Sequence, residues 1–177
     1  EPTRVRRLMM TSEPTTAYVW IWLPGGEDPV VCGRLDDDGK RISFVYAISY
    51  RMRPDAVALY EPELRLLSGE QFAASGLRLP LCIDDAMPDA WGRRLVNHRR
   101  GAATSELGEL TYLVESGSDR IGALDFQSDR ERYVARELSN PSLDDLATAA
   151  ERIEAGHALE PALETVLLRG TSLGGAR

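Results

Sequence analysis

Residues 17–47, AYVWIWLPGGEDPVVCGRLDDDGKRISFVYA, decide the fold of this chain. Three runs within it, 17–23, 30–35 and 41–47, are rich in β-branched and aromatic residues, which favour strands. The sequences PGGEDP and DDDGK separate the runs and contain the glycine, proline and Asp-Gly signals of tight turns. Short turns between strands of this kind predict an antiparallel β-meander.

The spacing of apolar residues changes from strand-like to helical after residue 84. In 84–100, DDAMPDAWGRRLVNHRR, aspartates able to cap a helix precede Trp91, Leu95 and His98, which recur at helical spacing. We expect Trp91 to pack in the core, because tryptophan is usually buried to a large extent. The neighbouring arginines are expected to reach solvent or pair with carboxylates. The pattern therefore predicts a helix packed against the sheet.

Further elements are predicted on both sides of this helix. Among the prolines that precede it, the apolar segments 56–60 and 77–80 predict short edge strands. After it, 105–117 begins with a serine cap and ends at a glycine, which predicts a second helix. The segment 121–127, IGALDFQ, predicts another strand. Together these elements indicate an α+β fold, an antiparallel sheet with packed helices.

The chain divides into regions of different composition. The expected regions are a mobile lead, 1–16, an α+β domain, 17–140, and a helical region, 141–177. Charge is dense and apolar residues are few in 128–141, which predicts a linker. Two amphipathic helices are predicted over 141–156 and 160–170, each closed by a glycine.

Composition and charge exclude several classes of protein. The 177 residues are 43% hydrophobic, which is enough for one domain with a core. The net charge of -7 argues against an extended nucleic-acid surface, because phosphate contacts need clustered Lys and Arg. No apolar run approaches the roughly 18 residues of a membrane span, so a cytoplasmic protein without membrane partners is expected. Cys32 and Cys82 lack metal-site spacing and are predicted to be buried thiols.

Two other stretches with potential chemistry have simpler explanations. The acidic run DDDG at 36–39 could suggest calcium, but no EF-hand spacing follows, so a solvated hairpin tip is predicted. The two histidines, His98 and His157, lie far apart in the sequence without a neighbouring partner. Neither is predicted to be catalytic, and no metal site is expected.

The glycine-rich sequence TSLGGAR, 171–177, is the main candidate for ligand contact. Gly174 and Gly175 beside Ser172 would let backbone N–H groups approach phosphate oxygens closely. The run lacks the lysine of a P-loop and does not match GxGxxG, so the residues alone leave open a phosphate loop or a flexible linker. Because the chain starts at Glu1 and stops inside this run, we expect a fragment of a longer protein.

Three stretches together resemble the amino-terminal part of HipA-like serine/threonine kinases, the toxins of bacterial toxin-antitoxin systems. They are DDAMPDAWGRRLV at 84–96, GSDRIGALDF at 117–126 and the terminal TSLGGAR, and they occur in the order seen in the family. The glycine-rich loop of that family commonly reads Ser, any residue, Gly, Gly, Ala, Arg, Pro, Lys. Residues 172–177 match its first six positions. The resemblance covers 17–177, with little contribution from 48–80.

The resemblance implies a kinase that binds ATP and Mg²⁺ and is autophosphorylated on Ser172. Thr171 stays open as a second acceptor. The residues implied to contact ATP are Ser172, Leu173, Gly174, Gly175, Ala176 and Arg177. The implied partners are a HipB-like helix-turn-helix antitoxin, which would make any DNA contact, and the remainder of the kinase domain. The protein substrate is not indicated.

The same resemblance implies that the catalytic and metal-binding aspartates of the kinase lie farther along the polypeptide. The sequence contains no HRD-type catalytic loop and no DFG-type metal site. A regulatory and architectural role is therefore expected, with no catalytic residues and no tight binding of nucleotide by this segment alone. The alternative is a free-standing amino-terminal module that restrains a separately encoded kinase.

Overall fold

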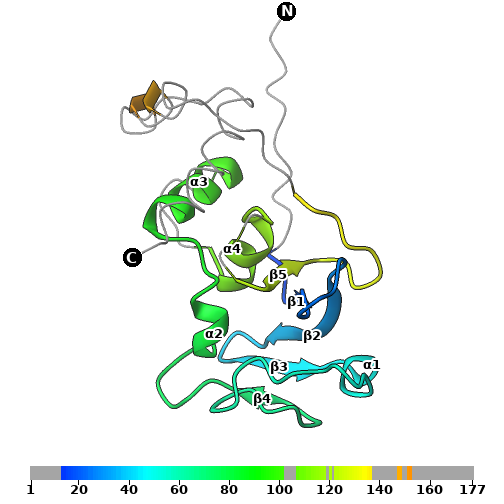
Figure 1. Cartoon of the computed structure of the whole chain (residues 1–177). Helices are drawn as coiled ribbons and strands as arrows, with labels where there is room; N and C mark the ends of the chain where they lie inside the picture. The colour runs from blue at the N-terminus through cyan, green and yellow to red at the C-terminus, as the bar shows by residue number, and fades with distance from the viewer. Residues whose placement is uncertain are drawn as a thin grey trace, which may run out of the picture.

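A five-stranded antiparallel sheet organises the molecule, as Figure 1 shows. The computed structural model describes residues 13–101, 107–118, 120, 122–136, 147–148 and 151–152. The strands are β1 (Thr16–Ile21), β2 (Val30–Asp37), β3 (Ile42–Tyr46), β4 (Gln71–Phe72) and β5 (Leu124–Gln127). Their order in the sheet is β4-β3-β2-β1-β5, and every neighbouring pair is antiparallel. The predicted meander forms β1 to β3, and the predicted α+β class is confirmed.

Four helices are defined in the part of the chain that the structure describes. They are α1 (Ile48–Arg51), α2 (Leu81–Asp84), α3 (Ala90–Arg100) and α4 (Glu109–Glu115). The helix α4 packs on β1 and β5, and α3 contacts α4. Side chains alternate between the two faces of a strand, and this explains the core. One face of the sheet carries Val19 and Ile21 of β1 and Phe126 of β5. It packs against the buried Leu110 and Leu113 of α4.

The acidic run between β2 and β3 forms a hairpin turn, as predicted. Asp38 Oδ1 accepts hydrogen bonds from the backbone N–H groups of Lys40 and Arg41, each at 2.7 Å. Asp37 accepts one from the N–H of Gly39, whose φ of 84° is a conformation that glycine adopts without strain. These aspartates shape the turn by bonding the backbone two or three residues ahead.

The edge strands predicted at 56–60 and 77–80 are wrong. The edge strand is β4, and the only sheet-like pairing near the first segment is an isolated bridge between Tyr60 and Leu64. The Tyr46 hydroxyl accepts a hydrogen bond from the N–H of Leu59 and donates one to the carbonyl of Leu64, which holds this segment as a loop. Ala56 and Leu59 of this segment, like Leu79, pack in or against the core from loops instead of strands.

Both predicted helices begin later than the sequence indicated. The region 84–100 is divided, because α2 ends before Pro88 and α3 starts at Ala90, with Asp89 Oδ1 accepting from the N–H of Gly92 at 2.8 Å. The helix α4 begins at Glu109 after Gly108, so Ser105 is not its cap. The strand predicted over 121–127 is confirmed in its second half, as β5.

A residue distant in the sequence accepts hydrogen bonds at the start of α4. Glu13 Oε2 accepts hydrogen bonds from the N–H of Gly108 at 2.5 Å and from the Thr111 hydroxyl at 3.2 Å. A carboxylate at the positive end of a helix is favourable. Glu13 lies in the segment predicted to be a mobile lead, so the ordered fold extends at least four residues ahead of position 17.

Several predictions fall outside the described residues. The helices predicted at 141–156 and 160–170 lie there for most of their length, as do the boundaries of the regions they belong to. The side chains of Trp91, Leu95 and His98 are also outside the description, although their backbone lies in α3. The core position of Trp91 therefore stays a prediction.

Candidate functional site

The residues predicted to contact nucleotide, Ser172 to Arg177, lie outside the described residues, and so do Thr171 and His157. Two other groupings of polar side chains stand out in the part that the structure describes. One is an open pocket beside the β2–β3 hairpin, and the other is a buried ionic cluster at β5.

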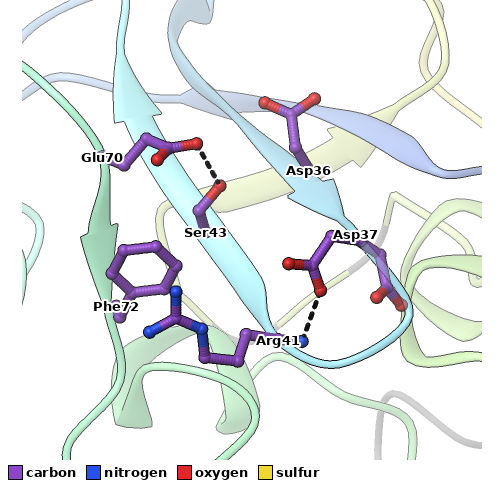
Figure 2. A pocket seen from close by; sticks show the side chains of 7 residues that line it. Asp36, Asp37, Arg41, Ser43, Glu70 and Phe72 are labelled. Carbon is purple, nitrogen blue, oxygen red and sulfur yellow. Dashed lines mark hydrogen bonds between the residues drawn. The ribbon is translucent and has the colours of Figure 1, made fainter.

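The open pocket lies where strands β2, β3 and β4 run side by side (Figure 2). It has a volume of about 160 Å³. Its lining residues are Asp36, Asp37, Asp38, Arg41, Ser43, Glu70 and Phe72. The Arg41 guanidinium lies 4.1 Å from the centre of the Phe72 ring, and Ser43 donates a hydrogen bond to Glu70 at 3.5 Å.

The carboxylates of this pocket already have partners. Asp36 is 2.7 Å from Arg34, and Asp37 is 3.2 Å from Arg78. The hydrogen bonds from the backbone of Arg41 and Lys40 lower the pKa of Asp38, which keeps its carboxylate charged. Within the described residues, no group of three or more His, Cys, Asp or Glu side chains is placed to hold a metal ion. The pocket is therefore a charged hairpin tip whose carboxylates each have a partner within the chain.

The buried ionic cluster is centred on Asp125, which is inaccessible to solvent. Its carboxylate lies 3.1 Å from Arg120 Nε and 2.6 Å from an Arg136 guanidinium nitrogen, and it accepts a hydrogen bond from the Ser118 hydroxyl at 2.7 Å. Gln127 donates a further bond to it at 3.2 Å. A buried carboxylate needs several such partners, because an unpaired carboxylate in the protein interior is strongly unfavourable.

The electrostatics of the cluster favour the charged form of Asp125. Burial opposes the ionisation of Asp125, but Arg136, Ser118 and Arg120 outweigh burial and hold its pKa below the ordinary value. Burial lowers the pKa of Arg120 to about 10, the attraction of Asp125 counteracts this, and the charge of Arg136 adds to the lowering. Both guanidiniums thus compete for one carboxylate.

Three members of this cluster lie in a stretch that the sequence had singled out, although no role was predicted for them. Ser118, Arg120 and Asp125 all lie in GSDRIGALDF, one of the stretches that carried the family resemblance. Arg136 comes from the segment predicted to be a linker, and no sequence signal distinguished it from the other arginines there. The cluster joins these distant positions by packing, and its geometry is that of a structural anchor.

The motif in α3 also has a structural explanation. The Arg93 guanidinium lies over the ring of Tyr112 in α4, 4.9 Å from its centre, and donates to the carbonyl of Pro88. This aromatic contact differs from the solvent or carboxylate expected for the arginines beside Trp91. Toward the end of α3, Arg99 and Arg100 pair with Glu115 at 2.5 and 2.8 Å. These contacts join α3 to α4.

The two cysteines show no sign of activation. Cys32 is fully buried, as predicted, and burial raises the pKa of its thiol. Cys82 was also predicted to be buried but is only half-buried, and burial raises the pKa of its thiol to about 11. Reactive thiols have a lowered pKa instead.

Among the described residues, no helix has the length and apolar character needed to cross a membrane.

Comparison with known proteins places the chain in a family. Searches of curated proteins and of solved structures gave no significant match. A family model described as the HipA N-terminal domain matches residues 22–127, more than half of the chain. This range includes strands β2 to β5, the helices α1 to α4 and the Ser118, Arg120 and Asp125 cluster. The chain therefore belongs to the HipA N-terminal domain family.

Proposed function

We propose that this chain is the amino-terminal regulatory and architectural segment of a HipA-like serine/threonine kinase toxin of a toxin-antitoxin system. The observation that carries the proposal is the order of two features along the chain. The family match at 22–127 precedes a glycine-rich sequence, 172–177, that resembles the ATP loop of these kinases. The cytoplasm is the compartment in which such a kinase would act.

The chemistry of the loop follows from its glycines. Backbone N–H groups near Gly174 and Gly175 would contact the phosphates of ATP, with Ser172, Leu173, Ala176 and Arg177 completing the loop. In the complete kinase, Mg²⁺ would neutralise phosphate charge, and it would be held by residues farther along the polypeptide. Phosphorylation of Ser172 adds roughly 1.5 to 2 negative charges, which repel the nucleotide. The modified loop would then leave the site, and activity would fall.

The described domain supports an architectural role. The carboxylates of its pocket are already paired, and its buried cluster lacks a free acid or base to act on a substrate. Its contribution to the kinase would be a rigid sheet that positions the helical region and presents a surface to a HipB-like antitoxin. Any contact with DNA would be made by the antitoxin.

A second candidate function is a free-standing module that restrains a separately encoded kinase. The extent of the family match favours it, because the match ends at residue 127 and concerns the amino-terminal domain alone. This alternative gives no role to the glycine-rich sequence. In cells it predicts that the chain is recovered in a complex with a kinase and carries no phosphate on Ser172.

Phosphosite mapping by mass spectrometry tests the proposal on the complete polypeptide, in an active form and in a catalytically inactive one. We expect phosphate on Ser172 in the active form only, together with weaker ATP binding by the phosphorylated protein. Ser172→Ala should keep the ATP affinity of unmodified protein. Ser172→Asp should mimic the inhibited state in part, because it has one charge and two oxygens instead of a full phosphate.

Thr171→Ala is the matched control, since it removes the neighbouring hydroxyl and should leave phosphorylation of Ser172 unchanged. Phosphate on Thr171 and never on Ser172 contradicts the proposed mechanism. Undiminished ATP binding by protein phosphorylated on Ser172 contradicts it as well.

A further inference from the structure

The segment 128–136, yellow in Figure 1, follows β5 and returns along it; we call it the strap. The backbone N–H and carbonyl of Val134 bond the side-chain amide of Gln127 at 3.1 and 2.9 Å. Two residues on, Arg136 donates to the carbonyl of Phe126 at 2.8 Å. The strap is thus antiparallel to β5 but is held by side chains instead of a backbone ladder.

The strap also covers the outer face of the sheet at one place. The Tyr133 ring lies 5.3 Å from the ring of Trp20 and 5.2 Å from that of Trp22. The indole N–H of Trp20 donates to the carbonyl of Asp129 at 3.1 Å. Strand alternation places Trp20 on the face opposite to Val19 and the core. Without the strap, this tryptophan would face water.

Few apolar contacts hold the strap, because most of its side chains are exposed. The exposed positions are Ser128, Asp129, Arg130, Glu131, Arg132, Val134 and Ala135. Only Tyr133 and Arg136 are partly buried, and they lie near its carboxyl end. Segments with little buried apolar surface open at a lower free energy than the core they rest on. Arg136 therefore carries a large share of the attachment.

The two arginines that share Asp125 differ in how they are built in. The Arg120 side chain is 8% exposed and also donates to the carbonyls of Leu113 and Ala86. The Arg136 side chain is 27% exposed, and it bonds the carbonyl of Val114 as well as Asp125 and Phe126. Arg120 is part of the core, whereas water reaches Arg136.

Loss of Arg136 would leave Asp125 with partners. Arg120, the Ser118 hydroxyl and the Phe126 N–H would continue to neutralise or bond its carboxylate. Removal of Arg136 would also relieve the repulsion between the two guanidiniums, which opposes the attraction that each has for Asp125. The cluster can therefore release one arginine without creating an uncompensated buried charge.

We propose that Arg136 is a latch, and that breaking its contacts with Asp125 and Phe126 releases the strap from β5 while the rest of the sheet stays folded. The open form would expose Trp20 and the outer edge of β5. The proposal rests on the described domain and is independent of any kinase activity.

Hydrogen exchange of the complete 177-residue chain, followed by mass spectrometry, tests the latch. The reporters are the backbone N–H groups of Val134 and Arg136, which are bonded to Gln127 and Ser118. In Arg136→Gln, peptides covering the strap should exchange at least about tenfold faster, since one charge-assisted hydrogen bond is worth that factor in an opening equilibrium. Peptides from β2 and β3 should exchange as in the wild type.

Arg130→Gln is the matched control, because Arg130 lies in the same strap and makes only an exposed pair with Glu131. It should leave strap exchange unchanged. If the strap of Arg136→Gln exchanges at the wild-type rate, the proposal is overturned. It is also overturned if exchange accelerates equally in the strap, β2 and β3, because the strap would then unfold together with the core. Wild-type protein gives a second test if the variant fails to fold: its strap should open more readily than β1 and β2, and equal protection overturns the latch.

Discussion

At the scale of single residues, Asp125 shows how one buried charge can organise several segments. Its carboxylate accepts hydrogen bonds from Ser118 and Arg120, which precede β5, and from Arg136 at the end of the strap. Burying Asp125 or Arg120 without its counter-charge would be costly, whereas water reaches the Arg136 side chain. Removing the central carboxylate should therefore cost more than removing Arg136.

Asp125→Asn should lower the free energy of unfolding by about 3 to 5 kcal/mol at neutral pH, because Arg120 loses its buried counter-charge. Chemical denaturation measures this loss. Asp55→Asn is the control, since Asp55 pairs with Arg53 at the surface, where water screens the attraction and the pair contributes little to stability. A loss as small as that of the control would show that the cluster adds little to stability.

A further prediction compares the stability of wild type and Asp125→Asn as the pH is lowered. The pKa of Asp125 in the folded protein lies below its ordinary value of 3.8, so its ionised form is favoured by folding. The stabilisation is complete above the unfolded pKa and is lost as the pH falls through the folded pKa. The difference in unfolding free energy between wild type and Asp125→Asn should shrink as the pH falls below 3.8. A difference that stays constant from neutral to acidic pH contradicts the charge-based explanation.

At the scale of secondary structure, the β2–β3 pairing depends on a close approach at Gly33. A Cβ atom there would lie 2.5 Å from the Val45 carbonyl oxygen and 2.6 Å from the Phe44 ring. Gly33→Ala should therefore push the strands apart and cost about 1 to 3 kcal/mol of stability. Thermal or chemical denaturation checks it, with exposed Arg34→Ala as the neighbouring control. Equal stability of Gly33→Ala and wild type would mean that the strands adjust freely.

The elements that the sequence predicted well are those fixed by local pattern. β1 to β3 follow from alternating apolar residues between glycine-containing turns, and these signals lie within a few positions of each strand. The start of α4 was missed because Glu13, far away in the sequence, supplies its hydrogen-bond acceptor. The strap was taken for a linker because it is dense in charge, and only the fold brings Arg136 to Asp125.

At the scale of the whole molecule, the structure tests the sequence-based predictions for the described domain but not those for the glycine-rich loop. The family was recognisable from three short stretches, two of which build α3 and the cluster around Asp125. The described side chains of these two stretches, such as Arg93, Arg120 and Asp125, serve packing and anchoring, so the resemblance located structural motifs within the described residues. The ligand-binding role of Ser172 to Arg177 stays a prediction, because those residues lie outside the description.

The last prediction concerns the chain acting alone. Purified in the presence of ATP and Mg²⁺, it should neither hydrolyse ATP nor label itself with γ-phosphate. Phosphoryl transfer needs metal ions, a catalytic aspartate and cationic groups around the transferred phosphate, and the sequence contains neither an HRD-type nor a DFG-type motif to supply them. The glycine-rich loop by itself offers backbone N–H groups, the Ser172 hydroxyl and the Arg177 guanidinium, but no aspartate to hold a metal ion or act as a base. Incubation with radiolabelled ATP measures incorporation, and Ser172→Ala serves as the control that separates loop labelling from background. Mg²⁺-dependent labelling that disappears in Ser172→Ala would show that the chain carries its own catalytic groups, and the architectural role would be wrong.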